Sequence, residues 1–154
     1  MNGVAAGAGA NIALCADLTV ASTSASFIQS FAKLGLLPDA GGTYLLPRLV
    51  GMQRAAGLAM LADKLSATDA KAMGLIWDVA EPDRLMATAT ALAERLAQMP
   101  TRGLGLTKRA FNESLSNDLF TQIEREADLQ SEAGRTADFA EGVRAFHEKR
   151  RLST

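Results

Sequence analysis

The turn around Asp39 places a carboxylate in an apolar stretch of the chain. The sequence GLLPDAGGTYLLPRLVG, residues 35–51, has leucines and a proline before Asp39, and glycines followed by an apolar segment after it. Apolar neighbours remove part of the water around a carboxylate. A partly dehydrated carboxylate is better suited to take up and release a proton near neutral pH. Asp39 could instead cap the expected helix by accepting hydrogen bonds from N–H groups near Gly41 or Gly42. Asp39 is therefore a candidate acid/base, with helix capping as the alternative.

A second candidate lies in the glycine-rich segment GAGAN, residues 7–11. A dinucleotide-binding turn needs a full strand before it and a further small residue at position 12, which is Ile12 here. Glycines at the start of a helix can instead let the backbone approach a ligand, with unpaired N–H groups facing an anion or oxyanion. Close packing of helices through small residues is the competing explanation, and it is the commoner use of glycine clusters.

The other residues with reactive side chains give weaker signals. His147 is the only histidine, and its charged segment FHEKRR favours a solvated helix position over a catalytic base. The basic residues 149–151 form a solvated helix end or hold phosphates. A single cysteine, Cys15, excludes an internal disulfide and fits a reducing compartment. Nothing in the sequence has the spacing of metal ligands, so no metal is expected.

Composition excludes several classes of protein. The 154 residues carry a net charge of -1 without a long basic run, which argues against nucleic acid as a partner. No apolar run approaches the roughly 20 residues that span a bilayer, so no membrane association is expected. The first ten residues lack the basic region of a signal peptide. We therefore expect a soluble, cytoplasmic protein.

Periodicity predicts elements that differ between the two halves of the chain. Residues 10–17, 41–51 and 52–63 read as helices, and a short helix capped by Ser66 or Thr68 ends near Gly74. Residues 18–27 and 75–81 read as strands. After residue 82 the pattern is purely helical, with four helices expected over 84–99, 103–115, 119–134 and 138–150.

The predicted organisation has two parts, residues 1–82 and residues 83–154. Two strands do not make an independent sheet, and the glycines that begin at Gly3 would normally follow a strand. Both features predict sheet partners upstream. We therefore expect the C-terminal part of a larger α/β protein.

Three segments together resemble one known family. NGVAAGAGANIALCADLTVAS, FAKLGLLPDAGGTYLLPRLVG and LSATDAKAMGLIWDVAE are similar, in order and spacing, to signatures of the enoyl-CoA hydratase/isomerase (crotonase) superfamily. The resemblance runs from residue 2 to about residue 150. GAGAN together with LPDAGGT is most similar to the branch that rearranges ring epoxides of phenylacetyl-CoA.

The resemblance implies a fold and a substrate. Residues 1–82 would be the C-terminal part of a spiral of ββα turns, and residues 83–154 would pack subunits into homotrimers, often paired into hexamers. The substrate would be an acyl-CoA, with coenzyme A as part of the substrate and no separate cofactor. The thioester carbonyl would sit between two backbone N–H groups that stabilise an enolate. One of them maps onto Ala8; the other would belong to a motif upstream of this chain.

The resemblance also implies roles for particular side chains. Hydratases of the family carry glutamates where Asn11 and Phe31 stand, whereas members that shift double bonds often carry a carboxylate where Asp39 stands. Asp39 would then remove and return one proton, and Asn11 would orient a substrate or water by hydrogen bonding. Phe146 and Lys149 match positions near the coenzyme A of a neighbouring subunit.

Three hypotheses follow from the sequence. The first is the C-terminal half of an isomerase that uses Asp39; the second is an enoyl-CoA hydratase, against which Asn11 and Phe31 count. The third is a truncated, non-catalytic module whose helices mainly oligomerise. The DNA upstream of Met1 distinguishes the third from the others, because an open frame encoding a further strand and oxyanion loop would mark a fragment of an active enzyme. As a fragment, the chain is expected to be inactive by itself.

Overall fold

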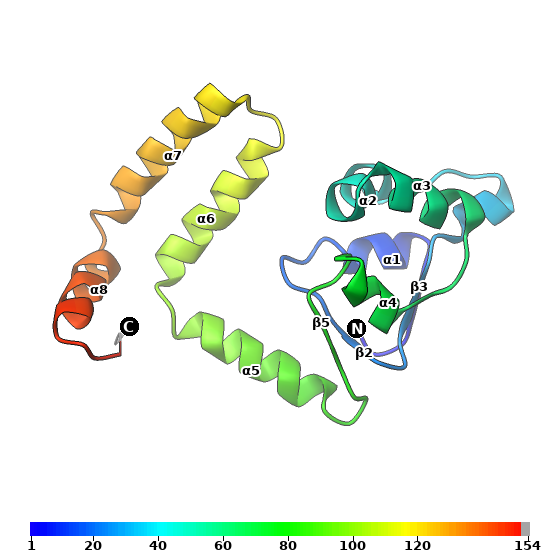
Figure 1. The fold of residues 1–154 in the computed structure, drawn as a ribbon, viewed down its shortest axis with the longest axis horizontal. Coiled ribbons are helices and arrows are strands. Elements are labelled where there is room, and N and C mark those ends of the chain that lie inside the picture. The colour runs from blue at the N-terminus through cyan, green and yellow to red at the C-terminus, as the bar shows by residue number, and fades with distance from the viewer. Residues whose placement is uncertain (152–154) are drawn as a thin grey trace. The chain divides into compact units, whose positions relative to one another are not determined.

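The computed structural model describes residues 1–151, which group into two compact units, one of residues 1–89 and one that begins at residue 90 (Figure 1). The division falls inside helix α5 (Leu85–Ala97). The boundary after residue 82 stays a prediction. Each unit is described by itself.

The first unit contains short strands in two small sheets. In the first sheet, β3 pairs with β1 in parallel and with β4 in antiparallel orientation; in the second, β2 pairs with β5 in parallel. The prediction of two strands is therefore wrong. Residues 18–27 form two strands, because the chain turns after Ser22, where the N–H of Ala25 donates to the Ser22 carbonyl at 2.9 Å. The strands are β1 (Val4–Ala6), β2 (Val20–Ser22), β3 (Ser26–Ile28), β4 (Leu65–Ser66) and β5 (Asp78–Ala80).

Helices cover these sheets, and local sequence explains where they begin. The expected helices over 41–51 and 52–63 are α2 and α3, which contact one another (Figure 1). The expected short helix is α4, and the structure selects Ser66 as its cap, since the Ser66 hydroxyl accepts from the N–H of Asp69 at 3.0 Å. The helical elements are α1 (Ala8–Ala13), the 3₁₀ helix η1 (Ser30–Leu34), α2 (Gly42–Val50), α3 (Met52–Leu61) and α4 (Ala67–Ala72).

Alanines make up much of the core of this unit. Small side chains let short strands and helices approach closely, and a few large apolar residues fill the remaining space. Leu46 of α2 is 2% exposed and Phe27 of β3 is 3% exposed. The buried cluster comprises Ala5, Ala10, Leu14, Ala21, Ala25, Phe27, Leu46, Val50, Ala55, Ala67, Ala70, Leu75 and Ile76. This core fixes the relative positions of α1, β3 and α2, the elements that carry the candidate site.

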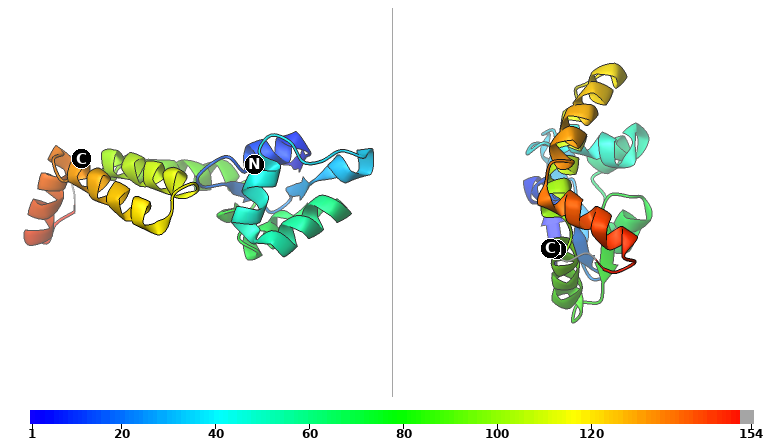
Figure 2. Two further views of the ribbon diagram at one scale, coloured as in Figure 1. Left: turned by 90° about the horizontal axis from the view of Figure 1, so that it is seen from above. Right: turned by 90° about the vertical axis from the view of Figure 1, so that its left-hand side faces the viewer.

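The second unit is helical throughout its described residues, as the sequence predicts. After α5 come α6 (Thr101–Ser114), α7 (Leu119–Ala133) and α8 (Ala137–His147). Helix α7 folds back beside α6 to form a hairpin (Figures 1 and 2). The side chains of Asp118 and Thr136 cap α7 and α8 by accepting from backbone N–H groups. None of the described helices is long and apolar enough to cross a membrane.

An ion-pair cluster joins the two helices of the hairpin. Glu113 of α6 accepts from the Nε of Arg125 of α7 at 2.5 Å and from the Nε of Arg109 at 2.8 Å. These hydrogen bonds, that from Arg125 first, lower the pKa of Glu113 to about 2. Arg102 and Glu132 pair nearer the other end of the hairpin.

Candidate active site

The turn that carries Asp39 is held by its main chain. The carbonyl oxygen of Asp39 accepts one hydrogen bond from Asn11 Nδ2 at 2.9 Å and another from the N–H of Gly42 at 2.8 Å. The next two residues, Ala40 and Gly41, have positive φ angles of 47° and 80°. The backbone thereby reverses tightly before α2 begins.

The Asp39 carboxylate takes no part in holding the turn. It is exposed and has no hydrogen bond or ion pair within residues 1–151. Helix α2 is capped by Gly41 without any side-chain hydrogen bond. Helix capping therefore does not explain Asp39, and its two oxygens are available for chemistry.

The apolar residues before Asp39 flank it without covering it. Leu36 and Leu37 are 60% and 72% exposed, and Asp39 is exposed as well. The partial burial that the sequence predicts for this carboxylate is therefore not provided by residues 1–151. The exposed leucines form an apolar surface beside Asp39, and a molecule or chain that packs on this surface would also bury the carboxylate.

Asn11 connects helix α1 to the Asp39 turn. Its side chain is 0% exposed, with Nδ2 donating to the Asp39 carbonyl and Oδ1 accepting from Gln29 Nε2 at 2.8 Å. Gln29 is 4% exposed and follows strand β3. Helix α1, the residue after β3 and the Asp39 turn, which are distant in sequence, thus meet at the buried side-chain amide of Asn11.

The first turn of α1 presents unpaired backbone donors. Gly7 has φ 55° and ψ −129°, and its carbonyl accepts from the N–H groups of Ala10 and Asn11 at 3.0 and 3.3 Å. Within the part of the chain that the structure describes, the N–H groups of Ala8 and Gly9 have no hydrogen-bond partner. An N–H group in this position can stabilise negative charge on a nearby oxygen.

The glycines of this turn serve different purposes. Gly7 is required by its positive φ, and a Cβ there would also lie 3.6 Å from the ring of Phe31. A Cβ on Gly9 would meet nothing within 4 Å. Close packing therefore does not explain Gly9, which leaves room beside the free N–H groups.

The first unit carries three of the predicted site residues, Ala8, Asn11 and Asp39. Ala8 and Asn11 lie on the same short helix, and Asn11 is bonded to the residue that carries the free carboxylate. An oxyanion donor together with a carboxylate suits removal and return of a proton next to a carbonyl group. Gln29 is part of this arrangement and was missed by sequence reasoning, because a lone polar residue after a short strand gives no signal for a contact 18 residues away.

The predicted coenzyme A residues lie in the second unit. Phe146 of α8 is 82% exposed and its ring meets that of His147 edge-on at 6.0 Å. His147 is exposed, as predicted. Phe146 also lines an apolar hollow of about 500 Å³ together with Phe139 and Val143. Lys149, past the end of α8, is exposed with φ 53° and has no ion pair within residues 1–151.

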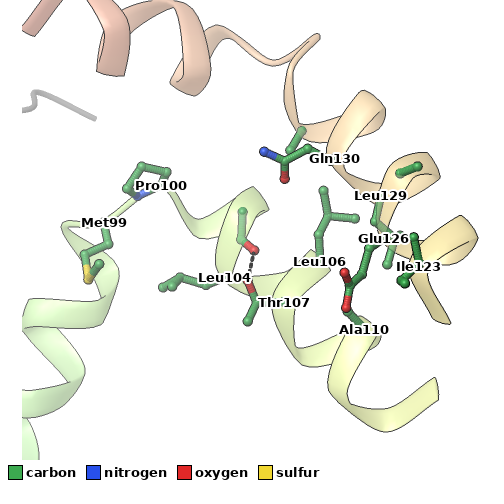
Figure 3. Close-up of a pocket in the computed structure, with 13 residues that line it drawn as sticks. Met99, Pro100, Leu104, Leu106, Thr107, Ala110, Ile123, Glu126, Leu129 and Gln130 are labelled. Atoms are coloured by element: carbon green, nitrogen blue, oxygen red, sulfur yellow. Dashed lines mark hydrogen bonds between the residues drawn. The ribbon is translucent and has the colours of Figure 1, made fainter. Parts of the chain in front are cut away.

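A larger apolar groove of about 720 Å³ lies between α6 and α7 (Figure 3). Leu104, Leu106 and Ala110 line one side, and Ile123 and Leu129 line the other. Most of its lining side chains are apolar, and Glu126 is the one acid among them. Among the described residues, no three His, Cys, Asp or Glu side chains gather as metal ligands would.

Comparison with known proteins gives consistent matches over almost the whole chain. The sequence pattern of the family described as enoyl-CoA hydratase/isomerase matches residues 1–153. The chain is 53% identical over 150 residues to a 1,2-epoxyphenylacetyl-CoA isomerase from Escherichia coli K12, with 97% of this chain and 57% of that protein covered. It is 51% identical to a protein of Rhodobacter capsulatus described as a probable enoyl-CoA hydratase, over 97% of this chain and 58% of that protein.

A solved structure shares the fold. An enoyl-CoA hydratase subunit I from Geobacillus kaustophilus HTA426 superposes with a TM-score of 0.95 at 35% identity, covering 99% of this chain and 60% of that one. The predicted fold class, the C-terminal part of a crotonase-like α/β spiral followed by helices, is thereby confirmed. The chain spans little more than half the length of the curated relatives it matches.

Proposed function

Because the chain belongs to the enoyl-CoA hydratase/isomerase family, we propose that the protein containing it isomerises an unsaturated or epoxide-bearing acyl-CoA. Asp39 acts as its single acid/base. The observation that carries this proposal is the Asp39 carboxylate, which is unbonded within residues 1–151 on a turn fixed through its own carbonyl. The similarity to a 1,2-epoxyphenylacetyl-CoA isomerase supports it.

The mechanism needs one proton and two groups of this chain. The thioester carbonyl of the substrate accepts a hydrogen bond from the Ala8 N–H, and a second donor comes from outside this chain. Asp39 removes a proton from a carbon near the thioester, and the electron pair moves onto the carbonyl oxygen as an enolate. Ala8 stabilises that charge. The protonated Asp39 then returns the proton at another carbon, which moves the double bond without a net change in atoms.

The contacts of Asn11 support a role at the Asp39 turn. The side chain has no exposed surface and its amide already binds Asp39 and Gln29. We therefore propose that Asn11 orients the Asp39 turn; direct contact with substrate or water stays untested.

Hydration is the second candidate, favoured by the 51% identity to a probable enoyl-CoA hydratase. Addition of water by paired carboxylates requires a second acid. In this chain Asn11 and Phe31 occupy the positions where the family resemblance implies glutamates. Isomerisation by one carboxylate is therefore the better-supported proposal.

The helices of the second unit support assembly of several subunits. Many large apolar side chains in this unit stay exposed, which is typical of surfaces that pack against other subunits. We propose a homotrimer or hexamer, in which Phe146 and Lys149 approach the coenzyme A of a neighbouring subunit. Sedimentation of the protein from the complete gene tests the assembly. The exposed side chains are Met99, Phe111, Leu115, Leu119, Phe120, Ile123, Phe139, Val143 and Phe146.

The reaction is tested with the protein expressed from its complete gene. Water addition and double-bond migration are measured on one panel of enoyl-CoA substrates, for the wild type, Asp39→Asn and the control Asp63→Asn. Asp63 is an exposed aspartate after α3. We expect migration to dominate and Asp39→Asn to lose about 100- to 10,000-fold in kcat, with Asp63→Asn unchanged. Dominant hydration, or full migration activity in Asp39→Asn, contradicts the proposal.

A further inference from the structure

Gln29 is a buried polar residue to which no role has been assigned. It lies between β3 and η1 and is 4% exposed. One half of its side-chain amide, Nε2, donates to Asn11 Oδ1 at 2.8 Å. The other half, Oε1, is buried without a hydrogen-bond partner among the described residues.

The direction of the hydrogen bonds is set by the Asp39 carbonyl. A carbonyl oxygen can only accept, so Asn11 must turn its Nδ2 toward Asp39. Its Oδ1 then faces Gln29, which must present its own NH₂ group. A flip of either amide would place two acceptors or two donors against each other. Gln29 therefore donates to Asn11, and Asn11 donates to the carbonyl oxygen of Asp39.

Stability does not decide between Gln29 and an apolar residue at this position. Its Oε1 loses water on burial and gains no partner within residues 1–151, which is unfavourable. An apolar side chain of similar length would avoid that penalty, but it would leave the buried Oδ1 of Asn11 without its donor. The benefit of Gln29 therefore lies in what its Nε2 does to Asn11.

We propose that Gln29 is a positioning residue for Asp39, acting through Asn11. The inference rests on the proposed function of Asp39. Gln29 locks the rotation of the Asn11 amide, so that Nδ2 stays aimed at the Asp39 carbonyl and the turn holds its carboxylate in one place. Without this lock, Asn11 rotates and the carboxylate loses its alignment with the substrate.

The test combines hydrogen exchange with kinetics on the protein from its complete gene. Gln29→Met keeps the length of the side chain and removes the donor. Ser26→Ala is the matched control, because Ser26 is 1% exposed on neighbouring β3 and its Oγ also lacks a partner among the described residues. We expect Gln29→Met to speed exchange of the Gly42 amide, which donates to the Asp39 carbonyl, about tenfold. It should lower kcat about 10- to 100-fold with KM within twofold. Ser26→Ala should change none of these.

Different results contradict the role of Gln29 and the proposed function of Asp39. Unchanged exchange at Gly42 in Gln29→Met overturns the inference, and so does faster exchange with unchanged kcat when Asp39→Asn is inactive. If Asp39→Asn retains full activity, the proposed function fails, and exchange at Gly42 still decides whether Gln29 holds the turn. Gln29→Asn, one methylene shorter and out of reach of Asn11, replaces Gln29→Met should that variant not fold.

Discussion

Gly42 approaches the Asn11 amide so closely that no side chain fits between them. A Cβ on Gly42 would lie 2.2 Å from Nδ2 and 2.6 Å from Cγ of Asn11, distances that real Cβ atoms do not reach. Asn11 is fully buried and bonded at both ends, so it has no room to move away. The first residue of α2 and the Asp39 turn are thus fixed against the same amide.

Gly42→Ala should therefore damage both stability and activity. We expect a loss of about 1–3 kcal/mol in the free energy of unfolding, because the added methyl overpacks a rigid site. Gly57→Ala is the control, since Gly57 lies inside α3 and a Cβ there meets nothing within 4 Å. That change should be neutral or stabilise by up to about 1 kcal/mol. Urea denaturation measures the free energy of unfolding of both variants. If Gly42→Ala is as stable as the wild type, Asn11 is able to move aside for the added methyl group.

Ser66 should stabilise α4 as its N-cap. Its hydroxyl accepts from the Asp69 N–H, and Ser66→Ala removes this bond, for an expected loss of about 0.5–2 kcal/mol. Thr68→Ala, at the other position that the sequence offered as a cap, should stay neutral or slightly stabilise because Thr68 lies inside the helix. The midpoints of urea denaturation of the two variants show which residue caps α4. A larger loss of stability in Thr68→Ala than in Ser66→Ala would make Thr68 the cap.

Acid should weaken the α6–α7 hairpin through Glu113. Hydrogen bonds from Arg125 and Arg109 lower the pKa of Glu113 from its usual 4.5 to about 2 in the folded protein. A lowered pKa contributes stability that is present above pH 4.5 and is lost as the pH falls through about 2. Glu113→Gln should remove this part of the acid sensitivity, as measured by urea denaturation between pH 7 and pH 2.5. Glu124→Gln, on α7 and without an ion pair among the described residues, should keep the wild-type profile.

Lys149 should contribute to binding of the coenzyme A portion of the substrate. The residue is exposed, so its attraction to phosphate is screened by water and salt. We expect Lys149→Ala to raise KM about two- to fivefold with little change in kcat, and the difference should shrink at high ionic strength. Lys64→Ala, an exposed lysine after α3, is the control. An unchanged KM at low salt would remove Lys149 from the site.

Sequence patterns predicted the long elements better than the short ones. The helices after residue 82 carry apolar periodicity over 11 to 15 residues, and each was found. Strands β1 and β4 have three and two residues, too few for alternation to appear. Their existence depends on pairing with β3, which is a tertiary contact.

The sequence indicates candidate site residues but not the contacts between them. Asp39 was singled out by its apolar neighbours, but only the structure shows that Gly41 caps α2 and that the carboxylate is left unbonded within residues 1–151. Asn11 was expected at a substrate, whereas the fold buries it against a turn 28 residues away. Local sequence carries no information on such a contact, because it depends on how α1 and α2 pack.

The anchoring of position 39 through its carbonyl has an evolutionary consequence. Every hydrogen bond that this residue makes within the described chain uses a main-chain atom of Asp39, and all amino acids share those atoms. The side chain can therefore be exchanged while the surrounding loop keeps its shape. One codon change at this position could alter which reaction the scaffold catalyses before any other part of it has to adapt.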